Sequence, residues 1–412
     1  MTKEEQRRLQ RQKEREQRDR DRAAWEAARG PMDLPFLLLA MVLLTIGLIM
    51  VLSASFPSAA SSETSNFDPL YYFKRQAAFG ALGVAAMFWM SKINYQRLRG
   101  VAKLALIVSV ILLILVVLPG PNKYGKLFGI RRNNSVRWMK LFLVAGPQFQ
   151  PSEVAKLGII LYFAATISKK REKMRTFKDG ILPYAVILVG IAGLMWMEPH
   201  LSGMILLLGI GAAMMVVGGI DWKWITAGVC GAGAGLYLML FTDLMEKIGY
   251  NSARITTWRD PFWDPLYQSY QTSQSLIAIG SGGLWGTGLG KSRQKFMFLP
   301  EEHNDCIFAI TCEELGLVGA TLIMVLFALL IIRGYWLAIH ARDRFGSLLI
   351  VGVTTQIALQ TFLNIAVVTN FIPNTGISLP FFSYGGTALA IQLLEVGIVL
   401  SVSRQIPAPK SK

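Results

Sequence analysis

The sequence predicts an all-α polytopic membrane protein with about ten transmembrane helices. Of its 412 residues, 53% are hydrophobic and only 17% are charged, whereas a soluble chain carries about a quarter charged residues. The charges are also segregated, because apolar runs of about 20 residues alternate with short charged connectors. The ten-residue alternation of a membrane β-barrel is not present in the sequence. These observations favour one helical membrane unit over a set of soluble domains.

The apolar runs define the expected membrane spans. They fall at residues 33–53, 75–91, 103–119, 152–168, 180–197, 201–219, 224–243, 305–332, 347–369 and 384–402. The first run is too long for a signal peptide, and no small-residue cleavage site follows it.

Basic connectors set the expected orientation, because Lys and Arg gather in cytoplasmic loops. The connectors after the second, fourth and eighth spans fall on one side of the membrane, together with both basic ends of the chain. They carry Lys92, Arg97, Arg99 and Lys103, then Lys169, Lys170, Arg171, Lys173, Arg175 and Lys178, and then Arg333, Arg342 and Arg344. We therefore expect both termini in the cytoplasm. This topology, rather than nucleic-acid binding, is the main explanation for the net charge of +16.

The chain divides into three expected segments. Residues 1–30 are a polar, mixed-charge cytoplasmic segment, and residues 405–412 are a cytoplasmic tail. Residues 31–404 form the membrane domain, with a large extracellular loop at 244–304 between helices 7 and 8. A connector of about sixty residues is too long for a passive turn. We therefore expect a site that faces the external leaflet.

Two outer connectors are basic, against the usual pattern. They contain Lys123, Lys126, Arg131, Arg132, Arg137 and Lys140, and in the large loop Lys247, Arg254, Arg259, Lys291, Arg293 and Lys295. Two explanations remain open. Long loops translocate regardless of charge and then meet lipid headgroups. Alternatively, the cations neutralise an anionic substrate, for which a pyrophosphate-bearing lipid is a natural choice.

The stretch LPEEHNDCIFAITCEELG, residues 299–316, combines five acids and a histidine at the start of the eighth span. Asp305 is the last acid before the apolar run, and a carboxylate at the edge of hydrocarbon usually has a function. Glu313 and Glu314 lie two to three turns further along, so we expect at least one of them to be paired as a structural polar lock. His303 is expected to be a rim residue.

Several motifs occur together in one order. They are GLIMVLSAS at 47–55, FQPSEVAKL at 149–157, ARITTWRDPFWDP at 253–265, YQTSQSLIAIGSGGLWGTGLGKSRQKFMFLPEEHNDCIFA at 270–309 and NTGISLPFFSYGGTAL at 374–389. On these motifs the chain resembles the SEDS family of bacterial cell-wall proteins, the FtsW, RodA and SpoVE group, over about residues 33–403. The long charged N-terminal segment favours the FtsW-like division type over the RodA-like type.

The chain departs from the family pattern at three positions. Asn304 and Cys306 flank the key aspartate where the family usually has Thr and Phe. The stretch EPHLSG, residues 198–203, has His200 where relatives carry an acid. The role of position 200 is therefore open, whereas the motif around Asp305 remains recognisable.

The resemblance implies a peptidoglycan glycosyltransferase. Members of the family polymerise lipid II, an undecaprenyl-pyrophosphate-linked substrate, on the outer face of the bacterial cytoplasmic membrane, and they work with a class B penicillin-binding protein. The resemblance places the family's catalytic aspartate on Asp305. Together with the charge pattern, it suggests as substrate-binding residues Arg254, Lys295, Arg137, Lys156, Glu153, Gln274 and Ser383.

The chemistry explains these residue types. A sugar hydroxyl is a weak nucleophile at neutral pH and needs a general base, for which Asp305 is the candidate. A diphosphate leaves without protonation once its charge is neutralised by cations such as Arg254, or by a shared Mg²⁺ or Mn²⁺. We expect no other cofactor. Glu153 and Lys156 share a helix face, which favours a local ion pair over a role in the substrate cavity.

Two other functions stay open. A lipid II flippase would use the same cavity and cations without chemistry, and a non-catalytic scaffold would only recruit division or elongation proteins. Replacing Asp305 with Ala separates the polymerase from both alternatives, because only the polymerase needs a base at this position.

Overall fold

The structure is a computed structural model, and it describes residues 30–119, 128–132, 135–140, 148–198, 200–241 and 253–406. Of the expected N-terminal segment only Gly30 is described, and of the expected tail only Gln405 and Ile406. The proposed boundaries of these two segments therefore stay predictions.

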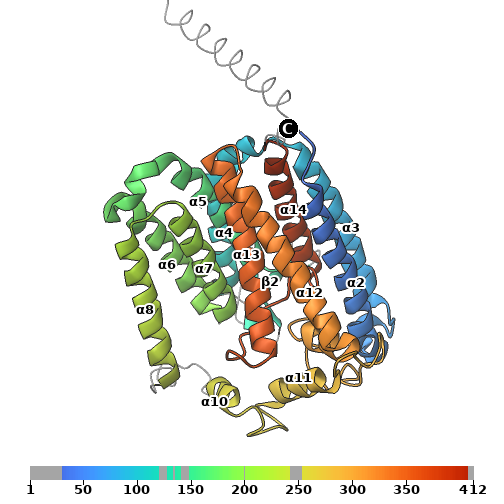
Figure 1. Cartoon of the computed structure of the whole chain (residues 1–412). Coiled ribbons are helices and arrows are strands. Elements are labelled where there is room, and N and C mark those ends of the chain that lie inside the picture. Colours follow the sequence, from blue (N-terminus) through green and yellow to red (C-terminus); the bar gives the residue numbers. More distant parts are fainter. Residues whose placement is uncertain are drawn as a thin grey trace, which may run out of the picture.

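Long helices that run side by side dominate the described residues (Figure 1). They are α2 (Leu34–Ser61), α3 (Tyr71–Lys92), α4 (Leu98–Val117), α5 (Pro151–Lys170), α6 (Leu182–Met197), α7 (Leu201–Val217), α8 (Trp222–Phe241), α12 (Ile307–Ile339), α13 (Arg344–Val368) and α14 (Gly386–Ser403). Each overlaps one of the expected spans, so the predicted helical architecture is confirmed.

Length and hydropathy together single out six stretches among the described residues as able to cross a membrane. They are Leu34–Ser61, Tyr95–Val117, Phe177–Met197, Ile307–Ile339, Arg344–Val368 and Gly386–Ser403, and Leu201–Val217 is a shorter apolar helix. The expected total of ten spans, and their orientation, therefore remain predictions.

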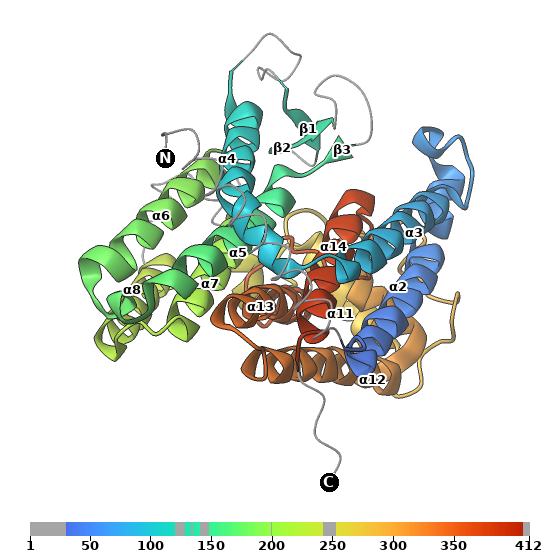
Figure 2. The same cartoon turned by 90° about the horizontal axis from the view of Figure 1, so that it is seen from above.

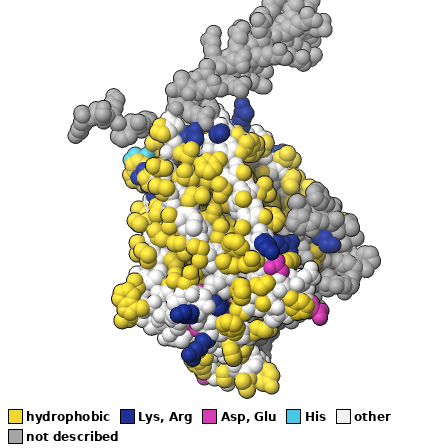
Figure 3. All heavy atoms as spheres, turned by 90° about the vertical axis from the view of Figure 1, so that its right-hand side faces the viewer, with side chains coloured by type: hydrophobic (Ala, Val, Ile, Leu, Met, Phe, Trp, Pro, Cys, Tyr) yellow, Lys and Arg dark blue, Asp and Glu magenta, His cyan; other side chains and the backbone are white. Residues whose placement is uncertain are grey.

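The helices form an inner and an outer group. In α13 and α14, 72% and 67% of the most apolar window is buried, against 28% in α12. Figure 2, which looks along the bundle, shows α13 and α14 surrounded by the other helices. An apolar helix that remains exposed suits contact with lipid rather than water. Hydrophobic side chains accordingly cover much of the face in Figure 3, with Lys and Arg at its upper end and scattered over its lower half.

A polar contact joins three helices at one end of the bundle. Asp33 caps α2 by accepting a hydrogen bond from the Phe36 backbone N–H at 2.9 Å. Its carboxylate also pairs with Arg333 of α12 at 2.5 Å, and its backbone N–H donates to Ser403 of α14 at 3.1 Å. The capping acid therefore fixes the relative height of α2, α12 and α14.

Short elements lie at the other end of the bundle. The described part of the large loop begins there with α10 (Ala253–Arg259) and α11 (Tyr270–Ser281), at the bottom of Figure 1. A small antiparallel sheet, which the sequence did not lead us to expect, consists of β1 (Ile130–Arg132), β2 (Ser135–Lys140) and β3 (Gln148–Phe149) in that order. Met139 of β2 is fully buried and packs with Val116 and Phe149, which attaches the sheet to the end of α4.

Helix α12 is interrupted at Gly316, whose φ of 67° is not helical. The large loop supplies the hydrogen bonds that the helix loses there. The Thr287 N–H donates to the Glu313 carbonyl, and the Leu317 N–H donates to the Gly283 carbonyl, both at 2.9 Å. A Cβ on Gly316 would lie 2.2 Å from backbone, so only glycine fits. Backbone groups at membrane depth need such partners.

Candidate functional site

A polar cavity of about 470 Å³ opens at the large-loop end of the bundle. Its walls come from β2, the starts of α5 and α7, α10, α11, the segment before α12, the segment before α14, and the inner helices α13 and α14. Six of the eight residues selected from the sequence line it: Asp305, Arg254, Arg137, Lys156, Glu153 and Ser383. Residues far apart in the chain therefore meet here.

Asp305 lies two residues before α12 begins, and its backbone carbonyl is bound by a side chain of α13. The Asn364 side chain donates to the Asp305 carbonyl at 2.9 Å and to the Ile377 carbonyl at 2.6 Å. Asn364 is fully buried in α13. Because the Asn364 amide binds both carbonyls, it holds the segment before α12, which contains Asp305, next to the segment before α14, which contains Ile377.

Gly376 packs against the carboxylate itself. Its φ is +68°, and a Cβ built on it would lie 3.0 Å from Asp305 Oδ2. Left-handed backbone favours glycine. The absence of a side chain at this position therefore leaves room for the aspartate carboxylate.

Ser383 shapes the wall beside the aspartate through its hydroxyl. That hydroxyl donates to the Asn304 carbonyl at 2.8 Å and accepts from the Leu379 N–H at 2.7 Å. The buried Gln76 of α3 donates to the Ser383 carbonyl at 3.1 Å. Ser383 thus ties the residue before Asp305 to the segment that precedes α14.

The two arginines approach Asp305 from different elements. Arg254 of α10 donates to the Asn374 carbonyl at 3.3 Å, and Arg137 is on β2. Burial, followed by the positive charge of Arg254, lowers the pKa of Arg137, whereas the Asp305 and Glu198 carboxylates act in the opposite direction. The guanidiniums and the aspartate therefore interact electrostatically within one cavity.

Glu153 and Lys156 form the ion pair that their spacing predicted, with 2.7 Å between carboxylate and ammonium. Both also line the cavity, although Lys156 is only 2% exposed. The local pair and the cavity position, which we treated as alternatives, are therefore compatible. An ammonium held by a neighbouring carboxylate is a pre-oriented cation on the cavity wall.

His200 lines the same cavity just before α7 begins. It is buried, and its Nε2 lies 3.2 Å from the Gln150 side-chain nitrogen. Burial first, and then the charges of Arg137 and Lys156, lower the pKa of His200 to about 3. The imidazole is therefore neutral at physiological pH, so this chain has an uncharged group at this position.

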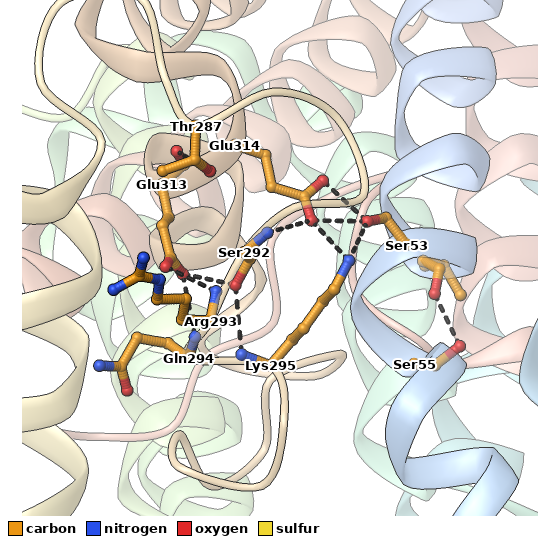
Figure 4. A network of polar contacts seen from close by, with 10 residues as sticks. Ser53, Ser55, Thr287, Ser292, Arg293, Gln294, Lys295, Glu313 and Glu314 are labelled. Atoms are coloured by element: carbon orange, nitrogen blue, oxygen red, sulfur yellow. Dashed lines mark hydrogen bonds and ion pairs between the residues drawn. The ribbon is translucent and has the colours of Figure 1, made fainter.

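Lys295 lies outside the cavity, contrary to our expectation. Its ammonium is 2.9 Å from Glu314 and 3.1 Å from the Ser53 hydroxyl of α2, and the residue is 3% exposed (Figure 4). The neighbouring Glu313 accepts hydrogen bonds from Ser292 and from the Arg293 N–H. The expectation of a structural lock is confirmed for both glutamates. We refer to Ser53, Lys295, Glu313 and Glu314 as the glutamate lock.

Gln274 is not among the cavity-lining residues, whereas Gln271, one turn earlier on α11, is. The side-chain oxygen Oε1 of Gln271 accepts from the Asn374 side chain at 3.2 Å, and the side-chain Nε2 of Gln271 donates to Cys306 Sγ at 3.3 Å. The sequence of α11 does not show which of the two glutamines faces the cavity, because this depends on how α11 packs against Asn374 and Cys306. Asn364 was also missed, since a lone amide in an apolar run is no specific signal.

A metal centre has no obvious ligand set in the described ranges. They contain no group of three or more His, Cys, Asp and Glu residues that could hold a metal ion. Asp305 and Glu301 are both on the cavity wall.

Comparison with known proteins identifies the family. The family model described as "Cell cycle protein", for FtsW, RodA and SpoVE, matches residues 33–407. The chain belongs to this FtsW, RodA and SpoVE family. Stage V sporulation protein E of Bacillus subtilis is 40% identical over 373 residues, which cover 90% of this chain and 97% of that protein. A probable peptidoglycan glycosyltransferase FtsW of Geobacter metallireducens is 36% identical over 375 residues, with 91% and 95% coverage.

Solved structures share the fold of this family member. One, reported for a peptidoglycan synthase complex, matches with a TM-score of 0.71 and 24% identity over 90% of this chain and 98% of that one. RodA of Thermus thermophilus matches with a TM-score of 0.63 and 24% identity, with 92% and 98% coverage. The family member described here is accordingly a multi-pass membrane protein.

Proposed function

We propose that this protein is a peptidoglycan glycosyltransferase that polymerises lipid II on the outer face of the cytoplasmic membrane. The supporting observation is that Asp305 lies in one polar cavity with Arg137, Arg254 and Lys156, at the large-loop end of an apolar bundle. Relatives that align over nine-tenths of the chain are named probable peptidoglycan glycosyltransferases.

The proposed reaction is a single displacement at the anomeric carbon of the donor. Asp305 accepts the proton of the acceptor sugar 4-hydroxyl as its oxygen forms the new bond to that carbon. The bond from the same carbon to the phosphate oxygen breaks, and the lipid diphosphate leaves as an anion. Arg137, Arg254 and Lys156 are the cations that would hold this leaving group, since guanidinium and ammonium groups both suit phosphate oxygens.

The decisive experiment measures glycan polymerisation by the purified protein on labelled lipid II. We expect Asp305→Asn and Asp305→Ala to lower the rate by about 100- to 10,000-fold, the range for losing a general base. Lipid II binding and the folded state should persist. Glu63→Gln, an exposed acid outside the cavity, is the matched control and should retain full activity.

Polymer formation by both Asp305 variants at the wild-type rate would rule out this base. If these variants still moved lipid II across vesicle membranes, and wild type made no polymer, a flippase would explain the cavity better. A cell that grows normally with Asp305→Asn as its only copy would instead favour a scaffold.

We also propose a class B penicillin-binding protein as the partner. A protein of the same fold was solved within a peptidoglycan synthase complex that coordinates polymerization and crosslinking. The polymerisation assay should therefore be run with and without the cognate transpeptidase, and we expect a higher rate with it.

A further inference from the structure

A second cavity, of about 390 Å³, opens at the opposite end of the bundle from Asp305, the upper end in Figure 1. It is bounded by the end of α5, the 3₁₀ turn Arg171–Arg175, the turn after α7 and the first turn of α13. Nothing in the proposed polymerisation uses this cavity, because no group that lines it lies near the aspartate.

Two arginines face this cavity from separate elements. Arg175 ends the 3₁₀ turn and Arg344 begins α13, and both are exposed. Within the described ranges neither guanidinium has an ion-pair or hydrogen-bond partner. Ser168 and Ser347 add hydroxyls, and Glu172 is the single acid on the lining. Two guanidiniums and two hydroxyls on facing walls match the oxygens of a phosphate group.

Aromatic side chains next to the cavity mark the depth of lipid headgroups. Phe177, two residues beyond Arg175, packs on Trp224 with 4.9 Å between ring centroids. Trp222, three residues beyond the lining Gly219, is 71% exposed. Exposed Trp rings of this kind gather at membrane–water interfaces. The arginines therefore lie at the end of the bundle where such rings occur, which is consistent with the level of phospholipid phosphates.

Part of the cavity lining is apolar and reaches the exposed surface of the bundle. Val217 lines it and is 53% exposed, and Val216 beside it is 43% exposed. Ile167 and Leu348 are buried beneath the polar groups. A ligand that fits has an anionic phosphate at the arginines and hydrocarbon that continues past the valines.

We propose that this cavity binds an anionic phospholipid of the leaflet at this end of the bundle. Arg175 and Arg344 bind the phosphodiester oxygens, Ser347 donates a hydrogen bond to them, and the acyl chains run along Val217. The Ser168 hydroxyl, which donates to the Ala165 carbonyl at 3.3 Å, turns to the phosphate when the lipid binds. Basic cavities between membrane helices bind anionic headgroups in this way. The proposal is independent of the glycosyltransferase function, because the two cavities lie at opposite ends of the molecule.

The test titrates fluorescent phosphatidylglycerol into the purified full-length protein in a zwitterionic detergent. We expect the Arg175→Gln/Arg344→Gln double variant to bind at least about fivefold more weakly than wild type, since both charged donors are lost. The matched control is Lys178→Gln, which removes an exposed cation at the same end of the bundle outside the cavity lining, and it should bind like wild type. An Arg175→Lys/Arg344→Lys variant retains the charge and should bind within about threefold of wild type.

Two competitors separate the possible sources of the phosphate. Millimolar inorganic phosphate and unlabelled phosphatidylcholine should not displace the probe, whereas unlabelled phosphatidylglycerol should. Equal binding by wild type and the glutamine double variant would overturn the proposal, as would an equal loss in Lys178→Gln. Displacement by inorganic phosphate would show a free-phosphate site instead.

If the double variant does not fold, each single glutamine variant should bind at least about twofold more weakly, and wild-type affinity in both would overturn the proposal.

Discussion

Gly376 and Asp305 show how closely the proposed site is fitted at the scale of single residues. The Oδ2 atom of Asp305 lies 3.0 Å from the position that a Cβ on Gly376 would take, which is closer than an ordinary contact. A general base works only within hydrogen-bond reach of its proton, so a small displacement is costly. The neighbouring backbone, rather than a charged partner alone, therefore sets the position of the base.

Gly376→Ala should lower the polymerisation rate at least tenfold, because the new methyl group displaces the Asp305 carboxylate. It should also cost about 1–3 kcal/mol of stability, because the backbone is left-handed. Gly290→Ala is the matched control, since Gly290 has a φ of +79° and open space around its Cβ position. Rate assays and thermal melts of both variants test this. Equal losses of activity would attribute the effect to backbone strain and not to the contact with Asp305.

His200 should make the protein sensitive to acid. An unfolded histidine has a pKa near 6.5, and in the folded protein the pKa of His200 falls to about 3. The folded state therefore binds fewer protons, so its stability is complete above pH 6.5 and falls by at most about 1.4 kcal/mol per pH unit between pH 6.5 and 3. Thermal melts at pH 7, 6 and 5 should show a smaller fall for His200→Gln than for wild type.

The control for this pH effect is His340→Gln. His340 is exposed at the opposite end of the bundle and should leave the pH slope unchanged. If His200→Gln has the slope of wild type, the buried imidazole does not cause the acid sensitivity, and carboxylates elsewhere must account for it.

At the scale of elements, the sequence predicted the positions of the helices along the chain better than the contacts between helices and loops. Apolar runs are a property of neighbouring residues, so each expected span coincides with a helix. The lock at Glu313 and Glu314 was also expected, because carboxylates two turns inside an apolar run need partners. The identity of that partner, Lys295, depends on how a distant loop folds back. Spacing holds no information about this contact, and for the same reason Gln274 was chosen instead of Gln271.

The glutamate lock should control stability rather than substrate affinity. Lys295→Ala leaves the buried Glu314 without its ammonium partner, which should cost about 3–5 kcal/mol. Lys295→Met/Glu314→Met removes both charges and should recover much of that loss. The exposed Lys291→Ala is the control and should melt like wild type. If Lys295→Ala melts normally but weakens lipid II binding, Lys295 contributes to the substrate site as first expected.

At the scale of the whole molecule, two ends of different character flank an apolar middle. One end carries the cavity around Asp305 and the large loop, and the other carries the basic connectors and the Asp33–Arg333 contact. The sequence placed the basic connectors at 92–103, 169–178 and 333–344 on one side and the large loop on the other, while the orientation in the membrane stays a prediction. The small sheet around Met139 was not expected, because its strands are too short for a periodic signal to stand out from an irregular loop.

Thiol labelling in spheroplasts tests the predicted orientation. In a Cys230→Ser background, which removes the exposed cysteine and leaves the two buried ones, a cysteine replaces Thr64 or Lys173. A membrane-impermeant maleimide should label Thr64→Cys in intact spheroplasts, and Lys173→Cys only after permeabilisation, because positive connectors stay inside. The reverse pattern would place the substrate cavity on the cytoplasmic side.

The interruption at Gly316 has a mechanical consequence. Residues 307–315 directly follow the proposed base Asp305, and the helical conformation of α12 is interrupted after them, at Gly316. Backbone hydrogen bonds to the large loop replace the missing helical ones there, from the Thr287 N–H to the Glu313 carbonyl and from the Leu317 N–H to the Gly283 carbonyl. The large loop therefore contacts the short first part of α12, which adjoins Asp305, on both sides of the kink. We expect substitutions in this loop to affect the position of Asp305 more than the packing of the long apolar part of α12 that follows Gly316.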